Sequence, residues 1–112
     1  MIRERFQKAI EIINKNDRGG FTVPTSKLYP HQWNWDSAFT ALGISTYNKI
    51  RAWQELILLI RAQWKNGMIP HIIFHENNPN YFPGPNHWQI KSNANTSCHS
   101  QPPVLASIIW DM

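Results

Sequence analysis

The sequence contains a single cysteine, Cys98, among its 112 residues. One thiol cannot form an internal disulfide, which argues against the small secreted domains that depend on disulfides. The most apolar run, residues 56–60, is far shorter than the ~20 residues that cross a bilayer. The first residues carry no apolar segment of signal-peptide length. These absences predict a cytoplasmic protein with no membrane partner.

Charged residues are scarce as well. Asp, Glu, Lys and Arg make up 16% of the chain, whereas about a quarter is usual in soluble domains. The net charge is +4 with the histidines neutral, and the basic residues are dispersed rather than gathered in a run. This pattern is typical of a solvated surface, so no nucleic-acid partner is expected.

The spacings of common metal and nucleophile sites are lacking too. Neither a CxxC nor an HExxH pattern occurs, and His71 and His75, four residues apart, follow a proline that disfavours a helix. Cys98 and His99 are adjacent, so their side chains rarely point at each other, and no third group is evident to orient them. The sequence therefore predicts no metal ion and no other cofactor.

Tryptophan and proline are abundant by contrast, with six Trp and eight Pro, in a chain that is 42% hydrophobic. Tryptophan combines a large flat apolar face with one N–H donor. So many tryptophans indicate either a deep core or surfaces on which sugar rings stack.

Apolar residues at helical spacing predict a first amphipathic helix from Ile2 to Asn16, ended by the breaker Asp-Arg-Gly-Gly at 17–20. A second helix is expected to begin at Asp36 or Ser37, either of which could cap it.

The third helix has the strongest pattern. Its apolar stripe consists of Ile50, Trp53, Ile57, Ile60 and Trp64. We expect Gly67 to end this helix after Asn66.

Residues 68–100 are rich in Asn, Pro, Gly and His but also contain many apolar residues, which predicts a long, ordered and packed loop. A last helix is expected to begin near Pro102 and Pro103, because proline suits a first turn. The chain stops at Met112 without a capping signal. We therefore expect residues 1–112 to be the N-terminal fragment of one larger all-α domain, truncated in mid-helix.

The candidate binding element is the segment 29–37, with Tyr29, Trp33, Trp35 and Asp36. Aromatic faces match the C–H faces of pyranose rings, and a carboxylate accepts charge-assisted hydrogen bonds from vicinal hydroxyls. A position at a helix start would also favour the ionised form of Asp36. The alternative is an aromatic core segment with Asp36 as helix cap, and both interpretations can hold together.

Three further segments could contribute to a site. Residues 63–71 end in a proline-flanked His71, although a helix C-cap followed by a loop explains them as well. Residues 81–88, with Tyr81 and Trp88, could line a cleft or form a packed surface loop. Gln101 precedes a helix, and its amide could both donate to and accept from a hydroxyl, unless the segment only caps that helix.

The motifs Tyr-Pro-x-Gln-Trp-x-Trp-Asp-Ser, Ala-Gln-Trp-x-Asn-Gly-Met-Ile-Pro-His, Tyr-Phe-Pro-Gly-Pro and Thr-Ser-x-x-x-Gln-Pro-Pro follow one another along residues 29–106. In this order they resemble the six-hairpin glycosidases, in particular glycoside hydrolase family 63 and its mannosylglycerate hydrolase-like members. The sequence departs from the family at residues 98–100, Cys-His-Ser, where Gly-Ile-Thr is common.

The resemblance implies an all-α fold that is part of an (α/α)6 barrel. It implies a hydrolase in carbohydrate metabolism, an inverting α-glycosidase acting on an α-glucoside or α-mannoside of small size. It assigns substrate contacts to Tyr29, Trp33, Trp35, Asp36 and Gln101, and we add His71 at the end of the second motif. The alternative is a non-catalytic sugar-binding remnant or a helical scaffold protein. The oligomeric state is not determined.

Glycoside hydrolysis requires a general acid and a general base. We place Glu4, Glu11 and Glu55 on helix surfaces and Asp17 in a turn, and Asp111 lies at the chain end. Only Asp36, and less plausibly Glu76, lies in a site-like context. The sequence therefore predicts no catalytic residue in these 112 positions, and an inactive fragment.

Overall fold

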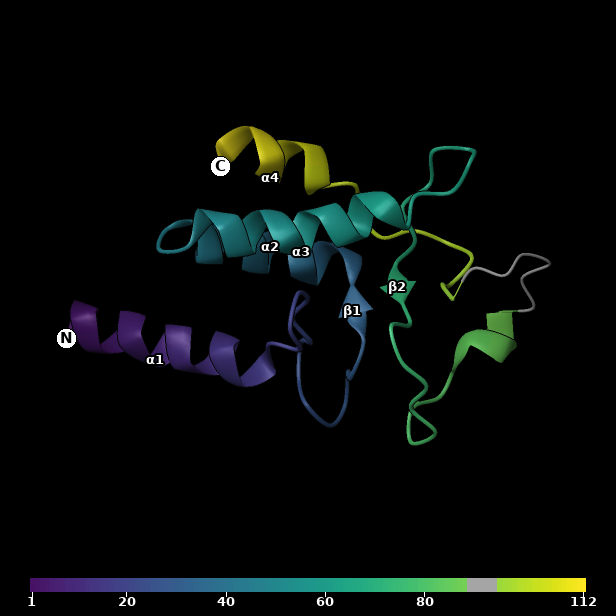
Figure 1. Ribbon diagram of the computed structural model, residues 1–112, viewed down its shortest axis with the longest axis horizontal. Coiled ribbons are helices and arrows are strands. Elements are labelled where there is room, and N and C mark those ends of the chain that lie inside the picture. The colour runs from purple at the N-terminus through teal and green to yellow at the C-terminus, as the bar shows by residue number, and fades with distance from the viewer. Residues whose placement is uncertain (89–94) are drawn as a thin grey trace.

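The computed structural model describes residues 1–88 and 95–112, so that residues 89–94 of the predicted long loop lie outside the described residues. The helices and strands are α1 (Ile2–Asn16), β1 (Gln32–Trp33), α2 (Asn34–Ser45), α3 (Lys49–Arg61), β2 (Ile72–Ile73), the 3-10 helix η1 (Pro85–Trp88) and α4 (Leu105–Asp111). Figure 1 shows α2 and α3 side by side and running in opposite directions, with α4 against them and both strands at one end. The predicted all-α character is confirmed, apart from two short strands.

Helix α1 ends at Asn16 as predicted, because the next residues form a tight turn. The Arg18 amide donates to the Phe21 carbonyl at 2.8 Å. Gly19 and Gly20 adopt φ angles of 83° and 148°, which other residues rarely adopt. The helix itself has no buried residue, and its Phe6 only meets Tyr47 edge-on.

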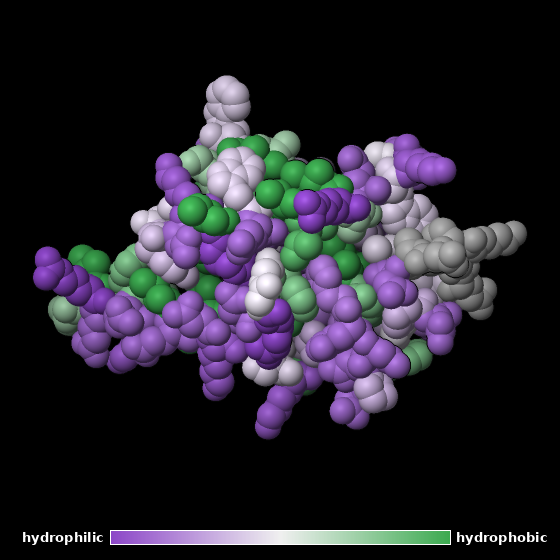
Figure 2. Space-filling view, viewed as in Figure 1, coloured by the Kyte–Doolittle hydropathy of each residue, from purple (hydrophilic) through white to green (hydrophobic). Residues whose placement is uncertain are grey.

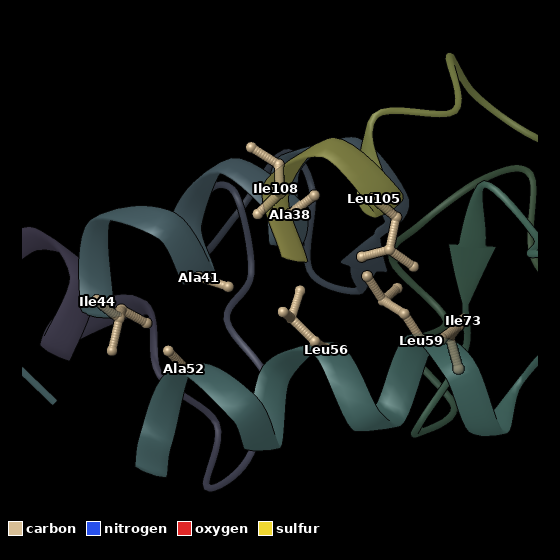
Figure 3. Close-up of a cluster of buried hydrophobic side chains, with 9 residues drawn as sticks. All are labelled: Ala38, Ala41, Ile44, Ala52, Leu56, Leu59, Ile73, Leu105 and Ile108. Atoms are coloured by element: carbon tan, nitrogen blue, oxygen red, sulfur yellow. The ribbon is translucent and has the colours of Figure 1, made fainter. Parts of the chain in front are cut away.

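The core lies between α2, α3 and α4 (Figure 3). Small residues of the α2–α3 hairpin, such as Ala41 and Ala52, let the helix backbones approach, while Leu56 and Leu59 fill the space toward α4. Each fully buried Leu or Ile contributes about 1.5–3 kcal/mol. The complete cluster consists of Ala38, Ala41, Ile44, Ala52, Leu56, Leu59, Ile73, Leu105 and Ile108.

Helix α2 begins at Asn34, so the prediction that Asp36 or Ser37 caps it is wrong. Its free N–H groups are bound by distant parts of the chain instead. The Asn34 amide donates to the His71 carbonyl at 2.9 Å, and the Trp35 amide donates to Oε1 of Gln101 at 3.1 Å. A helix start that is held by tertiary contacts carries no local sequence signal.

Helix α3 begins after a regular cap, in which the Arg51 amide donates to Oδ1 of Asn48 at 3.0 Å. It ends at Arg61 rather than at the predicted Asn66. The reason is a separate turn, in which the Trp64 amide donates to the Met68 carbonyl at 2.8 Å. Gly67, with φ of 91°, belongs to this turn and not to a helix cap.

The predicted stripe of α3 is not its buried face. Ile50, Trp53, Ile57 and Ile60 are 77%, 40%, 41% and 42% exposed, whereas the buried residues of α3 are Ala52, Glu55, Leu56 and Leu59. Both faces of the helix are therefore apolar, and only one is covered by α2 and α4. Figure 2 shows hydrophobic residues gathered over α3 and α4.

Helix α4 starts at Leu105, two residues after the prolines predicted to form its first turn. The carbonyl of Pro102 accepts instead from the Val104 amide at 2.8 Å, in a turn before the helix. Leu105 and Ile108 are the buried residues of α4. Among the described residues, no helix is long and apolar enough to cross a membrane.

The two faces of α3 predict different costs for neighbouring substitutions. Leu56→Ala removes a fully buried side chain and should lower the free energy of unfolding by about 2–5 kcal/mol. Ile57→Ala, one position further along the same helix, should cost less than about 1 kcal/mol because Ile57 is 41% exposed. Urea unfolding measures both, and equal losses would contradict the assignment of the buried face.

Candidate functional site

Three distant segments form one hydrogen-bonded layer next to the helices. β1 pairs antiparallel with β2, with Gln32 opposite Ile73 and Trp33 opposite Ile72. Residues 95–101 run along the other side of β2. The Phe74 amide donates to the Asn95 carbonyl and the His71 amide to the His99 carbonyl, both at 2.8 Å. This pairing brings Gln101 to the N-terminus of α2.

Trp33 lies at the centre of an aromatic cluster. Its ring is buried with Ile72 and Phe74. Tyr29 and Tyr81 meet it edge-on, with ring centroids at 5.3 and 5.4 Å. Two of the predicted site residues, Tyr29 and Trp33, are thus in contact, and Trp33 is a buried core residue.

His31 is a second buried member of this cluster that the sequence did not single out. It is almost fully buried, and its ring packs edge-on against Phe74 and Tyr81, with centroids at 4.8 and 5.2 Å. Burial lowers the pKa of His31, with a smaller opposite influence from Glu76. A neutral His31 therefore packs among the aromatic rings that surround Trp33.

Trp35, Asp36 and Gln101 meet at the first turn of α2. Trp35 is 41% exposed, so a large part of its indole faces outward. Gln101 uses its amide oxygen to accept from the Trp35 backbone. The amide nitrogen and the second lone pair of the amide oxygen are then left for a ligand, whereas the whole amide group was expected to be free.

The pKa of the Asp36 carboxyl group is shifted in the direction opposite to the one expected. Burial raises the pKa of Asp36, and hydrogen bonds to its own backbone and to the Trp35 side chain offset this only in part. The helix start was expected to favour the ionised form, but desolvation outweighs that effect. The partly buried carboxyl lies next to the exposed indole of Trp35.

His71 stacks face to face on His99, with ring centroids 4.1 Å apart and planes 9° apart. Trp88 of η1 meets both rings edge-on, at 5.2 and 4.8 Å. Burial, and secondarily the nearby His99, lower the pKa of His71 to about 4. His71 is therefore a neutral imidazole near pH 7, and its Nδ1 is buried without a hydrogen-bond partner among the described residues.

The placement of Glu55 on a helix surface is wrong, because this carboxylate is fully buried. Its Oε1 accepts from the Thr22 amide at 2.9 Å and from the Ser37 hydroxyl at 2.5 Å. Its Oε2 accepts from the Thr22 hydroxyl at 2.9 Å and pairs with Nη1 of Arg51 at 2.9 Å. The sequence contained a signal for this: positions 52, 55, 56 and 59 share one helix face, and the other three residues are Ala and Leu.

The six predicted site residues thus form two groups. Tyr29, Trp33 and His71 join one aromatic layer through Tyr81 and Trp88. The second group consists of Trp35, Asp36 and Gln101. Tyr81 and Trp88 were expected either to line a cleft or to form a packed surface loop, and both pack against the Trp33 cluster, whereas Phe82 from the same motif is exposed.

A pocket of about 490 Å³ lies between the end of α3 and α4 and reaches the start of α2, where it is lined by Asn34 and Ser100. Its lining is mainly apolar and includes Ile60, Met68, Leu105 and Ile109, but none of the six predicted residues. Within the part of the chain that the structure describes, no group of three or more His, Cys, Asp or Glu side chains is placed to hold a metal ion.

Known proteins with similar sequences define the class. A family model described as the mannosylglycerate hydrolase MGH1-like glycoside hydrolase domain matches residues 29–112. Mannosylglycerate hydrolase MGH1 of Selaginella moellendorffii is 50% identical over 97 residues, which cover 86% of this chain and 20% of that protein. Glucosylglycerate hydrolase of Mycolicibacterium hassiacum is 43% identical over 106 residues, covering 88% of this chain and 24% of that protein.

Solved structures agree with this class. The GH63 mannosylglycerate hydrolase of Thermus thermophilus, in complex with Tris, superposes with a TM-score of 0.86 at 50% identity, over 92% of this chain and 25% of that one. Its complex with glucose superposes with a TM-score of 0.74 at 48% identity, over 93% of this chain and 25% of that one. The helical hairpins and their aromatic loops are thus part of a six-hairpin glycoside hydrolase fold. More particularly, the chain belongs to the mannosylglycerate hydrolase MGH1-like family and spans about a quarter or less of the relatives' length.

The lowered pKa of His71 predicts acid sensitivity. A histidine in the unfolded chain has a pKa of about 6.5, whereas the pKa of His71 in the folded chain is about 4. Stability is therefore lost as pH falls between these values, by about 1–2 kcal/mol at pH 5. The free energy of unfolding of the wild type and of His71→Asn can be measured by chemical unfolding at pH 7.5 and at pH 5. The wild type should show the loss of stability that His71 causes, and the variant should lack it.

A substitution of His99 separates the two causes of the lowered pKa of His71, which are burial and the neighbouring imidazole. His99→Asn removes the neighbouring imidazole that contributes to it, so the pKa of His71 should rise while burial still holds it below the usual value. NMR titration of the His71 ring measures the change. An unchanged titration would show that the stacked ring has no electrostatic influence.

Proposed function

We propose that this chain forms the substrate-binding part of an inverting α-glycosidase that hydrolyses a small α-mannoside or α-glucoside. The observation that carries the proposal is the convergence of Trp35, Asp36 and Gln101 at the start of α2, beside the cluster around Trp33. An exposed indole, a carboxyl group and an amide donor at one helix end suit a ring that has apolar faces and a hydroxyl edge.

Each residue has a distinct role in this proposal. Trp35 supplies a stacking face, and Asp36 accepts hydrogen bonds from two adjacent hydroxyls. The amide nitrogen of Gln101 donates to a third oxygen, because its amide oxygen is held by the α2 backbone. Tyr29 and Trp33 form the wall of the subsite, and the neutral His71 adds a hydrogen-bonding edge.

The substrate class follows from the relatives' names. One is called a mannosylglycerate hydrolase and another a glucosylglycerate hydrolase, and the solved Thermus protein is described in complex with glucose. We infer that the ligand of this chain is a hexose linked to a small polar aglycone such as glycerate. The partner is thus a small saccharide or glycoside.

We further infer that this chain does not supply the catalytic pair. Asp17 and Glu55 are both paired with Arg51, so neither is placed to exchange a proton with a substrate. Asp36 alone adjoins the Trp35 and Gln101 groups, whereas inversion requires two carboxyl groups on opposite sides of the bond. The acid and base would come from the part of an (α/α)6 domain that follows residues 1–112 in sequence.

That division also accounts for the uncovered apolar surface. The exposed stripe of α3 and the apolar pocket beside α4 lie where further hairpins of such a domain could pack. Coverage of only 25% of the Thermus chain supports this interpretation.

Binding tests the proposal through a pair of equally exposed tryptophans. Asp36→Asn should weaken the binding of glucose or mannosylglycerate about tenfold or more, because a hydrogen bond to a charged group contributes roughly 1.5–3 kcal/mol. Trp35→Ala should weaken it several-fold, because it removes the apolar face on which the sugar stacks. Trp53→Ala is the control, since Trp53 is 40% exposed on α3 and Trp35 is 41% exposed. NMR titration measures the affinities. The proposal would be contradicted if the wild type did not bind the sugar, or if Trp53→Ala lost as much affinity as Trp35→Ala.

An activity assay tests the inference that this chain does not supply the catalytic acid and base. The chain on its own should bind but not hydrolyse mannosylglycerate and glucosylglycerate, as measured by release of free hexose. Clear turnover that Asp36→Ala abolishes would show instead that the 112 residues contain a catalytic carboxylate.

A further inference from the structure

Glu55 is linked to residues 29–37, which we call the recognition segment. The links lie on both sides of Trp33, Trp35 and Asp36 in this segment. Before Trp33, the Gln32 side chain donates from Nε2 to the Glu55 carbonyl at 3.1 Å and to its Oε1 at 3.4 Å. After Asp36, the Ser37 hydroxyl donates to the same Oε1 at 2.5 Å. One carboxylate oxygen therefore ties down both ends of the stretch that carries the proposed ligand contacts.

The environment of Glu55 makes these links rigid. Glu55, Gln32 and Ser37 are all fully buried or nearly so, and a buried carboxylate is tolerated only when its oxygens are paired and hydrogen-bonded. Arg51 supplies the counter-charge at 2.9 Å and Thr22 supplies two donors. Every displacement of β1 or of the α2 start would leave part of this charge unpaired.

Glu55 also determines which way the Gln32 amide points. With its NH2 group toward the carboxylate, Gln32 must present its oxygen to Nε2 of His75, 2.7 Å away. The opposite orientation would place the amide oxygen against an anionic oxygen. The proton of a neutral His75 is therefore held on Nε2, and the ring stacks on Phe21 with centroids 4.0 Å apart.

We propose that Glu55 is a positioning residue for the saccharide subsite: by binding Gln32 and Ser37 together it holds Trp33, Trp35 and Asp36 in their ligand-binding arrangement. It does not touch the sugar. This inference rests on the proposed function of the segment, but the arrangement of Gln32 and His75 can be measured without any ligand.

The principal test compares two variants at opposite ends of the Arg51 network. Glu55→Gln keeps the size of the side chain but removes its charge. Asp17→Asn is the control, because Asp17 pairs with Nε of Arg51 at 2.8 Å and has no hydrogen bond to Gln32 or Ser37 among the described residues. Both variants lose an ion pair, but only Glu55→Gln loosens the recognition segment. Glucose affinity should fall at least fivefold in Glu55→Gln and less than twofold in Asp17→Asn, and the Trp33 and Trp35 indole NMR signals should shift only in the former.

Ser37→Ala is the second variant, in case Glu55→Gln does not fold. It removes one link to Glu55 and leaves the ion pair in place, and it should weaken glucose binding at least threefold while shifting the Trp35 indole signal. Unchanged affinity in a folded Ser37→Ala and Glu55→Gln would overturn the inference, as would equal losses in Asp17→Asn.

The ligand-free measurement separates this inference from the proposed function. At pH 8, ¹⁵N NMR of the wild-type imidazoles should show His75 protonated on Nε2. Protonation on Nδ1 would mean that Gln32 is turned away from Glu55 and would overturn the positioning role. If the wild type shows the Nε2 form but does not bind glucose, the proposed function fails instead.

Discussion

The buried charge of Glu55 is the constraint on which the rest of this structure depends. An ionised carboxylate is costly to remove from water, and the cost is offset only when each oxygen finds donors and a counter-charge. Thr22 comes from the loop after α1, Gln32 from β1, Ser37 from α2 and Arg51 from α3 itself. Four parts of the chain must therefore converge on one point before Glu55 can be buried.

A second layer of order comes from backbone pairing. Residues 95–101 lie along β2, and this places Gln101 at the exposed amide of Trp35, 66 positions earlier in the chain. The same hydrogen bond closes the start of α2 and fixes the orientation of the Gln101 amide. A structural role and the proposed ligand-binding role would thus be combined in one amide, and preorganisation of this kind reduces the ordering cost of binding.

The sequence predicted features that depend on near neighbours. The end of α1 at Asn16 follows from two glycines with positive φ, and the packing of Tyr81 and Trp88 follows from the apolar content of their loop. It also predicted the family, because four motifs in a fixed order are specific even though each one is weak. The start of α2 was predicted wrongly, because its first amides donate to the His71 carbonyl and to the Gln101 side chain. The end of α3 was predicted wrongly, because residues 64–68 form a separate turn.

The sequence by itself determined the helical class and the glycoside hydrolase family, whereas the binding residues that it suggests stay a prediction. Only the tertiary structure decided which face of α3 is buried, since Ile57 and Leu56 are equally apolar and differ only in what packs on them. It also decided the role of Glu55, which becomes an anchor because donors from distant segments surround it. Local spacing predicts a helix and its stripes, whereas burial is a property of partners that lie elsewhere in the chain.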